Sequence, residues 1–358
     1  MADLKERTKE SDHSILEVNN LKKYFPIRSR YLRRHIGWIR AIDDISFSVK
    51  KGEIFGIVGE SGCGKSTLGK TILGIYRPTA GEVYLNGEKI DNLCWEKIKT
   101  VRKKIQYVYQ DPGTSLDPWW RIGKILREAL VIHHKDLGSN EINEKVKSIL
   151  KEVGLEEDHI YRFPHEFSGG QQRRLGLARI LILNPSLIIF DEPTSGLDVS
   201  VQATILNFFK EIKGIHDLTY MFISHDLEVI RAMADRVMVM YLGKIVETGD
   251  TELVFQSPIH PYTKLLLSAL PKIKPKSKED ESEKLIVGEP PDPQNLPSGC
   301  RFRPRCLQAM DVCSREEPQI QQVADGRYVA CKQIDNENNV IRACTSECVS
   351  ARKRTCDL

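Results

Sequence analysis

The stretch GESGCGKST at residues 59–67 directly follows the apolar run Ile54–Val58 and opens a helical pattern over residues 65–73. A strand, a glycine-rich turn and a helix in this order are typical of a phosphate-binding loop. The glycines allow backbone N–H groups to wrap phosphate oxygens, and the helix adds its positive N-terminal end. Chance would produce the pattern in roughly one chain in a hundred of this length, and the strand–loop–helix setting makes coincidence rarer.

Each position of this loop has an expected role in binding a nucleotide. Lys65 is expected to meet the β- and γ-phosphates, and Ser66 is expected to hold Mg²⁺. The other loop residues that we expect to contact the nucleotide are Gly59, Ser61, Gly62, Cys63, Gly64 and Thr67. The sequence therefore predicts ATP and Mg²⁺ as ligands.

A second motif, LIIFDEP at residues 187–193, is an apolar strand that ends in two carboxylates. Asp191 can bind Mg²⁺, and Glu192 can orient and deprotonate an attacking water. Taken alone, an acidic pair after an apolar strand is more often an ordinary loop start. Downstream of a phosphate loop, the pair predicts a site of nucleotide hydrolysis.

A third motif, FSGGQQRRL at residues 167–175, resembles the signature sequence of the ABC family. The residues that match are Ser168, Gly169, Gly170 and Gln171. A serine that caps a helix would describe the same local structure. The resemblance implies that this helix end faces the ATP held by an opposing subunit, so that two chains enclose two nucleotides.

Four further positions are similar to functional residues of ABC proteins. Gln110 in VYQDP resembles the glutamine that senses Mg²⁺, and Asp198 in SGLD resembles the D-loop aspartate at the dimer interface. His225 in ISHD resembles the histidine that contacts the γ-phosphate and steadies the catalytic glutamate. Phe25 in LKKYFP stands where the family places an aromatic ring on adenine, with Tyr24 as the neighbouring candidate and a core role as the alternative.

The order of strand and helix patterns predicts an α/β fold with a parallel sheet. The resemblance adds the P-loop ABC nucleotide-binding domain, with a RecA-like core, an antiparallel β subdomain and a helical signature subdomain. We expect this domain at residues 13–270 and its helical part at about 111–168. The charged, Pro-bearing stretch at 271–284 predicts a linker, and residues 285–358 predict a separate, small Cys-rich C-terminal extension.

Composition limits where the chain can act. Hydrophobic residues make up 41% and charged residues 28%, which is typical of a globular protein. No apolar run approaches the ~18 residues of a membrane span, and the charged N-terminus does not resemble a secretory signal. We therefore expect a cytoplasmic protein. The net charge of +4 is too small to indicate a nucleic-acid partner.

Seven of the nine cysteines follow residue 299, which in a reducing compartment favours metal binding over disulfides. The flanking segments HPYTKLLLSALP and GEPPDPQNLPSGCRFRPRC resemble the C-terminal extension of the ATP-binding subunits of oligopeptide and dipeptide importers. That resemblance implies a 4Fe-4S cluster on Cys300, Cys306, Cys313 and Cys331. Zinc held by four thiolates is the alternative, and Cys344, Cys348 and Cys356 lie beyond the matched part.

The resemblance implies an ATP-hydrolysing subunit of an ABC importer for dipeptides or oligopeptides. Its expected partners are a second ATP-binding chain, commonly a different homologue, two transmembrane permease subunits and, indirectly, an extracytoplasmic substrate-binding protein. The expected location is peripheral, at the cytoplasmic face of the cell membrane. The alternatives are an importer of nickel or oligosaccharides, a soluble ABC ATPase without a transport role, and a regulatory module that binds ATP without hydrolysing it.

Overall fold

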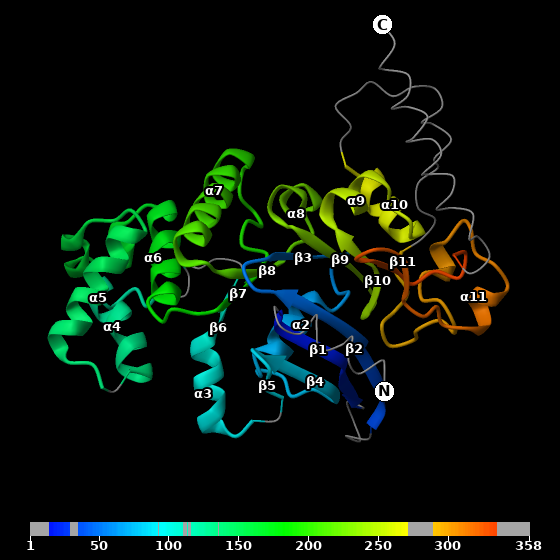
Figure 1. Cartoon of the computed structure of the whole chain (residues 1–358), viewed down its shortest axis with the longest axis horizontal. Coiled ribbons are helices and arrows are strands. Elements are labelled where there is room, and N and C mark those ends of the chain that lie inside the picture. The colour runs from blue at the N-terminus through cyan, green and yellow to red at the C-terminus, as the bar shows by residue number, and fades with distance from the viewer. Residues whose placement is uncertain are drawn as a thin grey trace, which may run out of the picture.

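A computed structural model describes residues 14–28, 35–91, 93–109, 113, 116–134, 136–270 and 289–334. The chain forms an eight-stranded sheet in the order β11-β12-β10-β9-β3-β8-β7-β6 and a four-stranded sheet in the order β2-β1-β4-β5 (Figure 1). The neighbours β9, β3, β8, β7 and β6 are parallel, as the sequence predicts. These strands are β3 (Ile54–Val58), β6 (Ile105–Val108), β7 (Leu187–Asp191), β8 (Thr219–Ile223) and β9 (Arg236–Tyr241).

The central strands are buried on both faces, and alternate residues enter two different cores. Ile189 on β7 packs in the core beneath α2 (Lys65–Ile72) and the small sheet. Its neighbour Phe190 packs in the core on the other face. The second core includes residues of α7 (Val199–His216) and α8 (Leu227–Met233). Another helix, α3 (Trp95–Lys104), leads directly into β6. Both cores hold the carboxyl ends of the strands, where the motifs lie.

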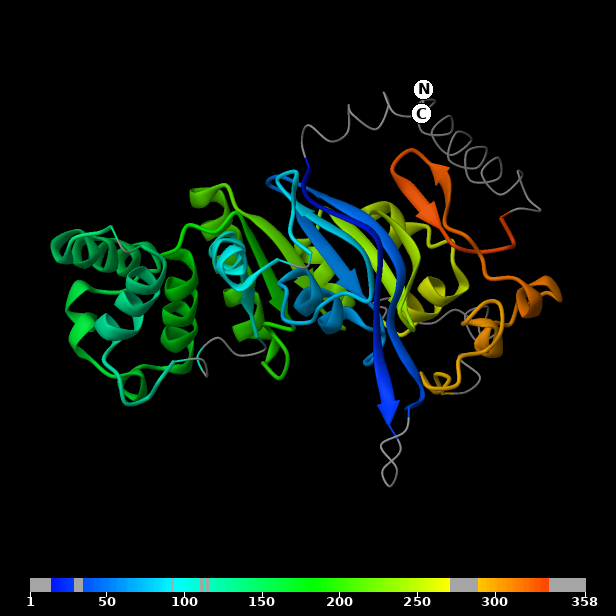
Figure 2. The ribbon, with the colours of Figure 1, turned by 90° about the horizontal axis from the view of Figure 1, so that it is seen from below.

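The small sheet is antiparallel and is dominated by one long hairpin. Its strands are β1 (Ser14–Arg28), β2 (His35–Lys50), β4 (Ala80–Leu85) and β5 (Glu88–Lys89). The far end of the β1–β2 hairpin projects from the body of the molecule in Figure 2. Asn86 and Gly87 both have positive φ and form the tight turn between β4 and β5.

Residues 116–181 include a helical subdomain that lies at one end of the large sheet (Figure 1). Its elements are α4 (Ile122–His133), α5 (Ser139–Glu152), η3 (Glu157–Tyr161), η4 (Pro164–Glu166) and α6 (Gly169–Leu181). Leu126, Val146 and Leu150 pack together with α6 as a continuation of the main core. The helical character predicted for this insertion is confirmed.

The sequence predicts a separate C-terminal unit, but this unit, residues 289–334, packs against the main domain. Its elements are η6 (Arg303–Arg305), α11 (Val312–Arg315), β11 (Gln321–Ala324) and β12 (Arg327–Val329). β12 pairs antiparallel with β10 (Lys244–Asp250) and so extends the main sheet. β10 would otherwise present unpaired backbone groups at a sheet edge, and the hairpin covers them. The predicted linker at 271–284 lies outside the described residues.

Two short helices, α9 (Thr251–Gln256) and α10 (Pro261–Ser268), follow β10 and complete the main domain. Asp250 caps α9 by accepting the backbone N–H of Leu253, and His260 caps α10 through Nδ1. Within the described part of the chain, no helix is both long enough and apolar enough to span a bilayer.

Candidate nucleotide site

The phosphate loop is fixed by close contacts that only glycine allows. Gly64 has a φ of 108°, and a Cβ there would lie 2.1 Å from the carbonyl oxygen of Ala41. A Cβ on Gly59, whose φ is 151°, would lie 2.2 Å from the carbonyl oxygen of Met240. The loop is therefore wedged between β2 and the end of β9, and any side chain at these positions would displace it.

Lys65 occupies the centre of this loop and is only 5% exposed. Its Nζ donates hydrogen bonds to the carbonyl oxygens of Gly59 (2.6 Å) and Glu60 (2.9 Å). The ammonium group is thus already inside the loop, held by weak acceptors that phosphate oxygens would outcompete.

The two predicted Mg²⁺ ligands lie in direct contact. Ser66 Oγ donates to Asp191 Oδ1 at 2.8 Å, and the hydroxyl of Tyr107 donates to Asp191 Oδ2 at 2.6 Å. Burial and the adjacent carboxylate raise the pKa of Tyr107, so its hydroxyl remains a donor. A hydroxyl and a carboxylate oxygen side by side match the hard ligands that Mg²⁺ prefers. The sequence analysis did not single out Tyr107, which only the β6–β7 pairing brings here.

Glu192 and His225 also lie together, with Nδ1 of the histidine 3.1 Å from Oε1 of the glutamate. Glu192 has a φ of 52°, which is an unfavourable conformation for a residue with a side chain. Its backbone N–H donates to the carbonyl of Ile223 on β8 at 2.9 Å, which holds that turn. Backbone strain of this kind is concentrated at functional sites.

Lys65, Ser66 and Glu192 line one cavity of about 190 Å³. Asp191 and His225 do not line it but contact Ser66 and Glu192, respectively. Its lining includes the polar side chains of Lys65, Ser66 and Glu192, the charged Arg40, and four large apolar side chains. Those four are Ile39, Leu242, Pro293 and Leu296, of which the last two belong to the C-terminal unit. The cavity therefore combines the groups that would bind phosphates with apolar side chains from three other segments of the chain.

Phe25 does not contribute to the cavity wall that the structure describes. Its ring packs edge-on against Tyr76 with 5.3 Å between centroids, and Lys23 Nζ lies 4.8 Å from its centroid. The neighbouring Tyr24 donates its hydroxyl to Asp43. The adenine contact predicted for Phe25 remains a prediction.

The signature residues form a regular helix start away from this cavity. Ser168 Oγ accepts the backbone N–H of Gln171, and the Gln171 side chain accepts the backbone N–H of Ser168, so the two form a capping box. A Cβ on Gly169 or Gly170 would meet no atom within 4 Å. Asp198 caps α7 in a similar way by accepting the N–H of Val201 at 2.9 Å. Gln110 lies outside the described residues.

Sequence comparisons agree with this geometry. The family "ABC transporter" matches residues 42–195, and the family "Oligopeptide/dipeptide transporter, C-terminal region" matches residues 246–313. The oligopeptide transport ATP-binding protein AppF of Bacillus subtilis is 48% identical over 326 residues, which cover 90% of this chain and 98% of that protein. The dipeptide transport ATP-binding protein DppF of Escherichia coli is 42% identical and covers 91% of this chain and 96% of its own length.

The chain belongs to the ATP-binding subunits of the oligopeptide/dipeptide ABC transporter family. Solved ABC proteins share its fold. CbiO1 from Clostridium perfringens has a TM-score of 0.59 at 28% identity, covering 68% of this chain and 92% of its own. The dimeric cassette MJ0796 bound to ADP and Pi has a TM-score of 0.56 at 27% identity, covering 66% of this chain and 98% of its own. The predicted P-loop ABC ATPase fold is confirmed.

In this ABC ATPase subunit, the four matched cysteines line one small cavity of the C-terminal unit together with His260 and Phe302. They are Cys300, Cys306, Cys313 and Cys331. The backbone N–H of Cys300 donates to the carbonyl of Cys313 at 2.8 Å, so a backbone hydrogen bond links the first and the third of the four cysteines. Burial, with a smaller contribution from the neighbouring thiols, raises the pKa of Cys300, Cys306 and Cys331.

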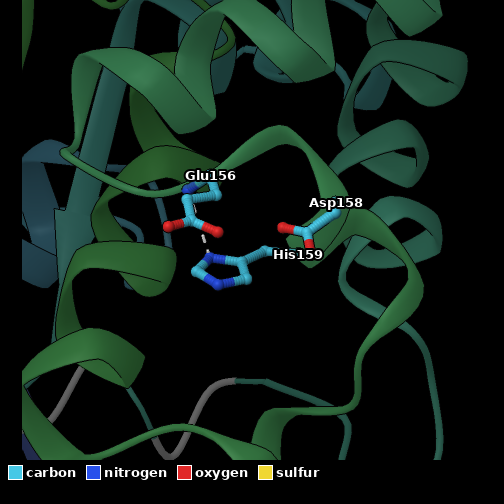
Figure 3. Close-up of side chains that lie close together, drawn as sticks. All are labelled: Glu156, Asp158 and His159. Atoms are coloured by element: carbon cyan, nitrogen blue, oxygen red, sulfur yellow. Dashed lines mark hydrogen bonds between the residues drawn. The ribbon is translucent and has the colours of Figure 1, made fainter.

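One other group of candidate metal ligands occurs among the described residues of the subunit, and Figure 3 shows it: Glu156, Asp158 and His159. His159 Nδ1 accepts the backbone N–H of Glu156 at 3.2 Å. The buried imidazole also packs edge-on against Phe167, with 5.0 Å between ring centroids. His159 Nδ1 is already used as a hydrogen-bond acceptor at the start of η3, which gives this group a structural role.

Two buried arginines of the C-terminal unit reach the phosphate loop of the ABC domain. Arg305 donates to both carboxylate oxygens of Glu60, each at 2.8 Å. Glu60 is the second residue of the loop, and its backbone N–H also donates to the hydroxyl of Tyr262 at 2.9 Å. Arg301 contacts both Asp43 on β2 and the carbonyl of Leu242. The C-terminal unit is therefore part of the structure that holds the loop.

Proposed function

We propose that this chain supplies the ATP-driven step of peptide import, in the manner of the importer subunits that it resembles. The observation that carries the proposal is that Lys65, Ser66 and Glu192 line one cavity, with Asp191 in contact with Ser66 and His225 in contact with Glu192. The peptide cargo is supported by the match to the oligopeptide/dipeptide C-terminal region and by the names of the relatives.

The residues divide the reaction among them. Lys65 neutralises the β- and γ-phosphates, and Ser66 and Asp191 hold Mg²⁺, which supplies charge neutralisation when bound. Glu192 orients the attacking water and accepts its proton, while His225 holds the glutamate side chain. Gln110 is assigned to sensing Mg²⁺ by resemblance alone.

A second ATP-binding chain, commonly a different homologue, completes the site in this proposal. Gly169 and Gly170 have room for a Cβ, so nothing described in this chain requires glycine there. A group that approaches from outside, such as the γ-phosphate of ATP on an opposing subunit, would require it. Asp198 lies on the same expected interface. Two permease subunits and an extracytoplasmic binding protein complete the assembly at the cytoplasmic face of the membrane.

The test is Glu192→Gln in the assembled transporter, reconstituted with its binding protein. We expect ATP turnover to fall by roughly 10²- to 10⁴-fold because the general base is lost, with MgATP binding retained and peptide uptake abolished. Glu228→Gln, an exposed glutamate on α8, is the matched control. Unchanged turnover with normal uptake would show that the partner site powers transport.

We also propose that the four thiols bind a 4Fe-4S cluster. Tetrahedral zinc with bonds of about 2.3 Å brings its sulfurs to about 3.8 Å from one another. No three of the described cysteine sulfurs fall within 4.8 Å of one another, and all four line a common cavity. That spread favours a ligand larger than one ion. With the thiols raised in pKa, binding would release protons.

Anaerobic purification followed by iron and sulfide analysis tests this assignment. We expect about four irons and four sulfides per chain in the native protein, lost in Cys313→Ser and retained in Cys94→Ser, an exposed cysteine of the main domain. One zinc per chain without sulfide would favour the four-thiolate alternative.

A further inference from the structure

The chemistry of the cavity wall matches the two ends of a nucleoside triphosphate. Lys65 and Ser66 mark the end that would receive phosphates. A nucleotide anchored there would place its ribose and base against other residues that line the same cavity. Beside Arg40, those residues include Ile39, Leu242, Pro293 and Leu296, against which an apolar ring can lose contact with water.

Leu296 and Pro293 are held in place before any ligand binds. The backbone N–H of Asn295 donates to the carbonyl of Asp292 at 2.9 Å, and the N–H of Gln294 donates to Asp292 Oδ1 at 2.8 Å. This turn places Pro293 at its exposed corner and returns Leu296, half-buried, against the main core. A preorganised contact binds a ligand without a further ordering cost.

The turn is joined to the phosphate loop through the rest of the C-terminal unit. Arg305 binds Glu60 with both terminal nitrogens, and Arg301 binds Asp43 on β2, the strand that also carries Ile39. The two guanidinium groups are buried, at 7% exposure for Arg301 and 6% for Arg305. These ties fix the distance between the wall and the loop, so that wall and loop can engage a single ligand.

We propose that Leu296, supported by Pro293, contacts the purine ring of the bound nucleotide. The C-terminal unit then forms one wall of the base site in the same chain. The proposal rests on the proposed function of the phosphate loop, and it adds a determinant of nucleotide affinity that the loop motif does not contain. Phe25, which faces Tyr76, is not needed for this contact.

The experiment measures equilibrium binding of MgATP and of inorganic tripolyphosphate, which has no base, to the purified full-length chain. We expect Leu296→Ser to raise the Kd for MgATP about tenfold and to leave the Kd for tripolyphosphate within about twofold. Leu296→Met should bind MgATP like the native chain. Leu307→Ser, the same change at an exposed leucine of the same unit, should alter neither ligand.

Two results would overturn the proposal. An unchanged Kd for MgATP in Leu296→Ser would show that the base does not contact this wall. An equal rise for MgATP and tripolyphosphate would show that the leucine acts on the loop and not on the base. Lys65→Ala tests the proposed phosphate binding separately from the base contact. Undiminished tripolyphosphate binding in that variant would refute phosphate binding by the loop, and the base contact would fall with it.

Discussion

The phosphate loop and the C-terminal unit position their functional groups in different ways. In the loop, nine consecutive residues hold Lys65 through carbonyls five and six positions away. In the C-terminal unit, four thiols spread over residues 300–331 meet in one cavity, and two arginines reach partners 245 and 258 positions earlier. The loop is a local backbone structure, whereas the C-terminal unit works through long-range side-chain contacts.

Substitutions in the two regions should therefore have different effects, on ligand binding in the loop and on stability in the C-terminal unit. A local backbone loop loses its ligand when its cation is removed but keeps its shape. A unit held by buried ion pairs loses stability when one partner is removed, because the other charge is left without compensation. The predictions below test that contrast.

Lys65→Ala should have the largest effect, on binding alone. We expect the affinity for MgATP to fall roughly a thousandfold, about 4 kcal/mol, because two charged hydrogen bonds to phosphate are lost. The urea midpoint should stay near the native value. A matched change at the exposed Lys210 of α7 should leave both quantities unchanged. Binding within tenfold of native in Lys65→Ala would contradict the contrast.

Arg305→Met should act mainly on stability. Loss of the guanidinium leaves Glu60 partly buried without its partner, and we expect a loss of about 3 kcal/mol in the free energy of unfolding. Glu60→Gln should cost less when Arg305→Met is already present, so a double-mutant cycle measured by urea unfolding should show coupling. Arg303→Met, two residues away and only half-buried, is the control. Additive effects of the two substitutions would show that Arg305 and Glu60 do not stabilise the fold as an ion pair.

Asp43→Asn should show a pH-dependent loss of stability. Burial opposes the charged form of Asp43, but the hydroxyl of Tyr24 and the guanidinium of Arg301 outweigh it and lower the pKa of this carboxyl below 3.8. The charged carboxylate therefore stabilises the fold above about pH 4, and this contribution is lost as pH falls through the lowered pKa.

We expect Asp43→Asn to lower the free energy of unfolding by about 2 kcal/mol at pH 7, with the difference shrinking below about pH 4. Urea titrations at several pH values measure it. The exposed neighbour Asp44 offers the control, since Asp44→Asn should change stability by less than about 0.5 kcal/mol. A penalty independent of pH would mean that shape, not charge, is what Asp43 contributes.

Asp292→Ala should have the smallest effect, and on nucleotide affinity rather than stability. Without the side chain that accepts the Gln294 N–H, the turn that carries Leu296 loosens. We expect the Kd for MgATP to rise about threefold, with tripolyphosphate unaffected. Asp325→Ala, in the exposed turn between β11 and β12, should match the native chain in the same binding assay. A larger loss than that of Leu296→Ser would contradict the assigned role of the turn.

Several features could be predicted from the sequence because they depend on neighbours in the chain. The phosphate loop, the buried strand before Glu192 and the serine cap of α6 each fit within about ten residues, so local spacing specifies them. The β-branched and aromatic strands and the helical insertion followed from periodicity in the same way. The resemblance to peptide-importer subunits added the roles that we expect for His225 and the four cysteines.

The remaining features were decided only by the tertiary structure. The hydrogen bond from Tyr107 to Asp191 depends on the pairing of β6 with β7, and the joining of β12 to β10 depends on an exposed edge that no local pattern marks. In the sequence nothing distinguishes Leu296 from an ordinary loop residue, and only the folded structure shows that it lines the same cavity as the phosphate loop. The sequence alone determined the chemistry of the phosphate end, because backbone geometry is local. Folding decided which distant side chains join the lining of the same cavity, because those contacts form only when remote segments of the chain pack together.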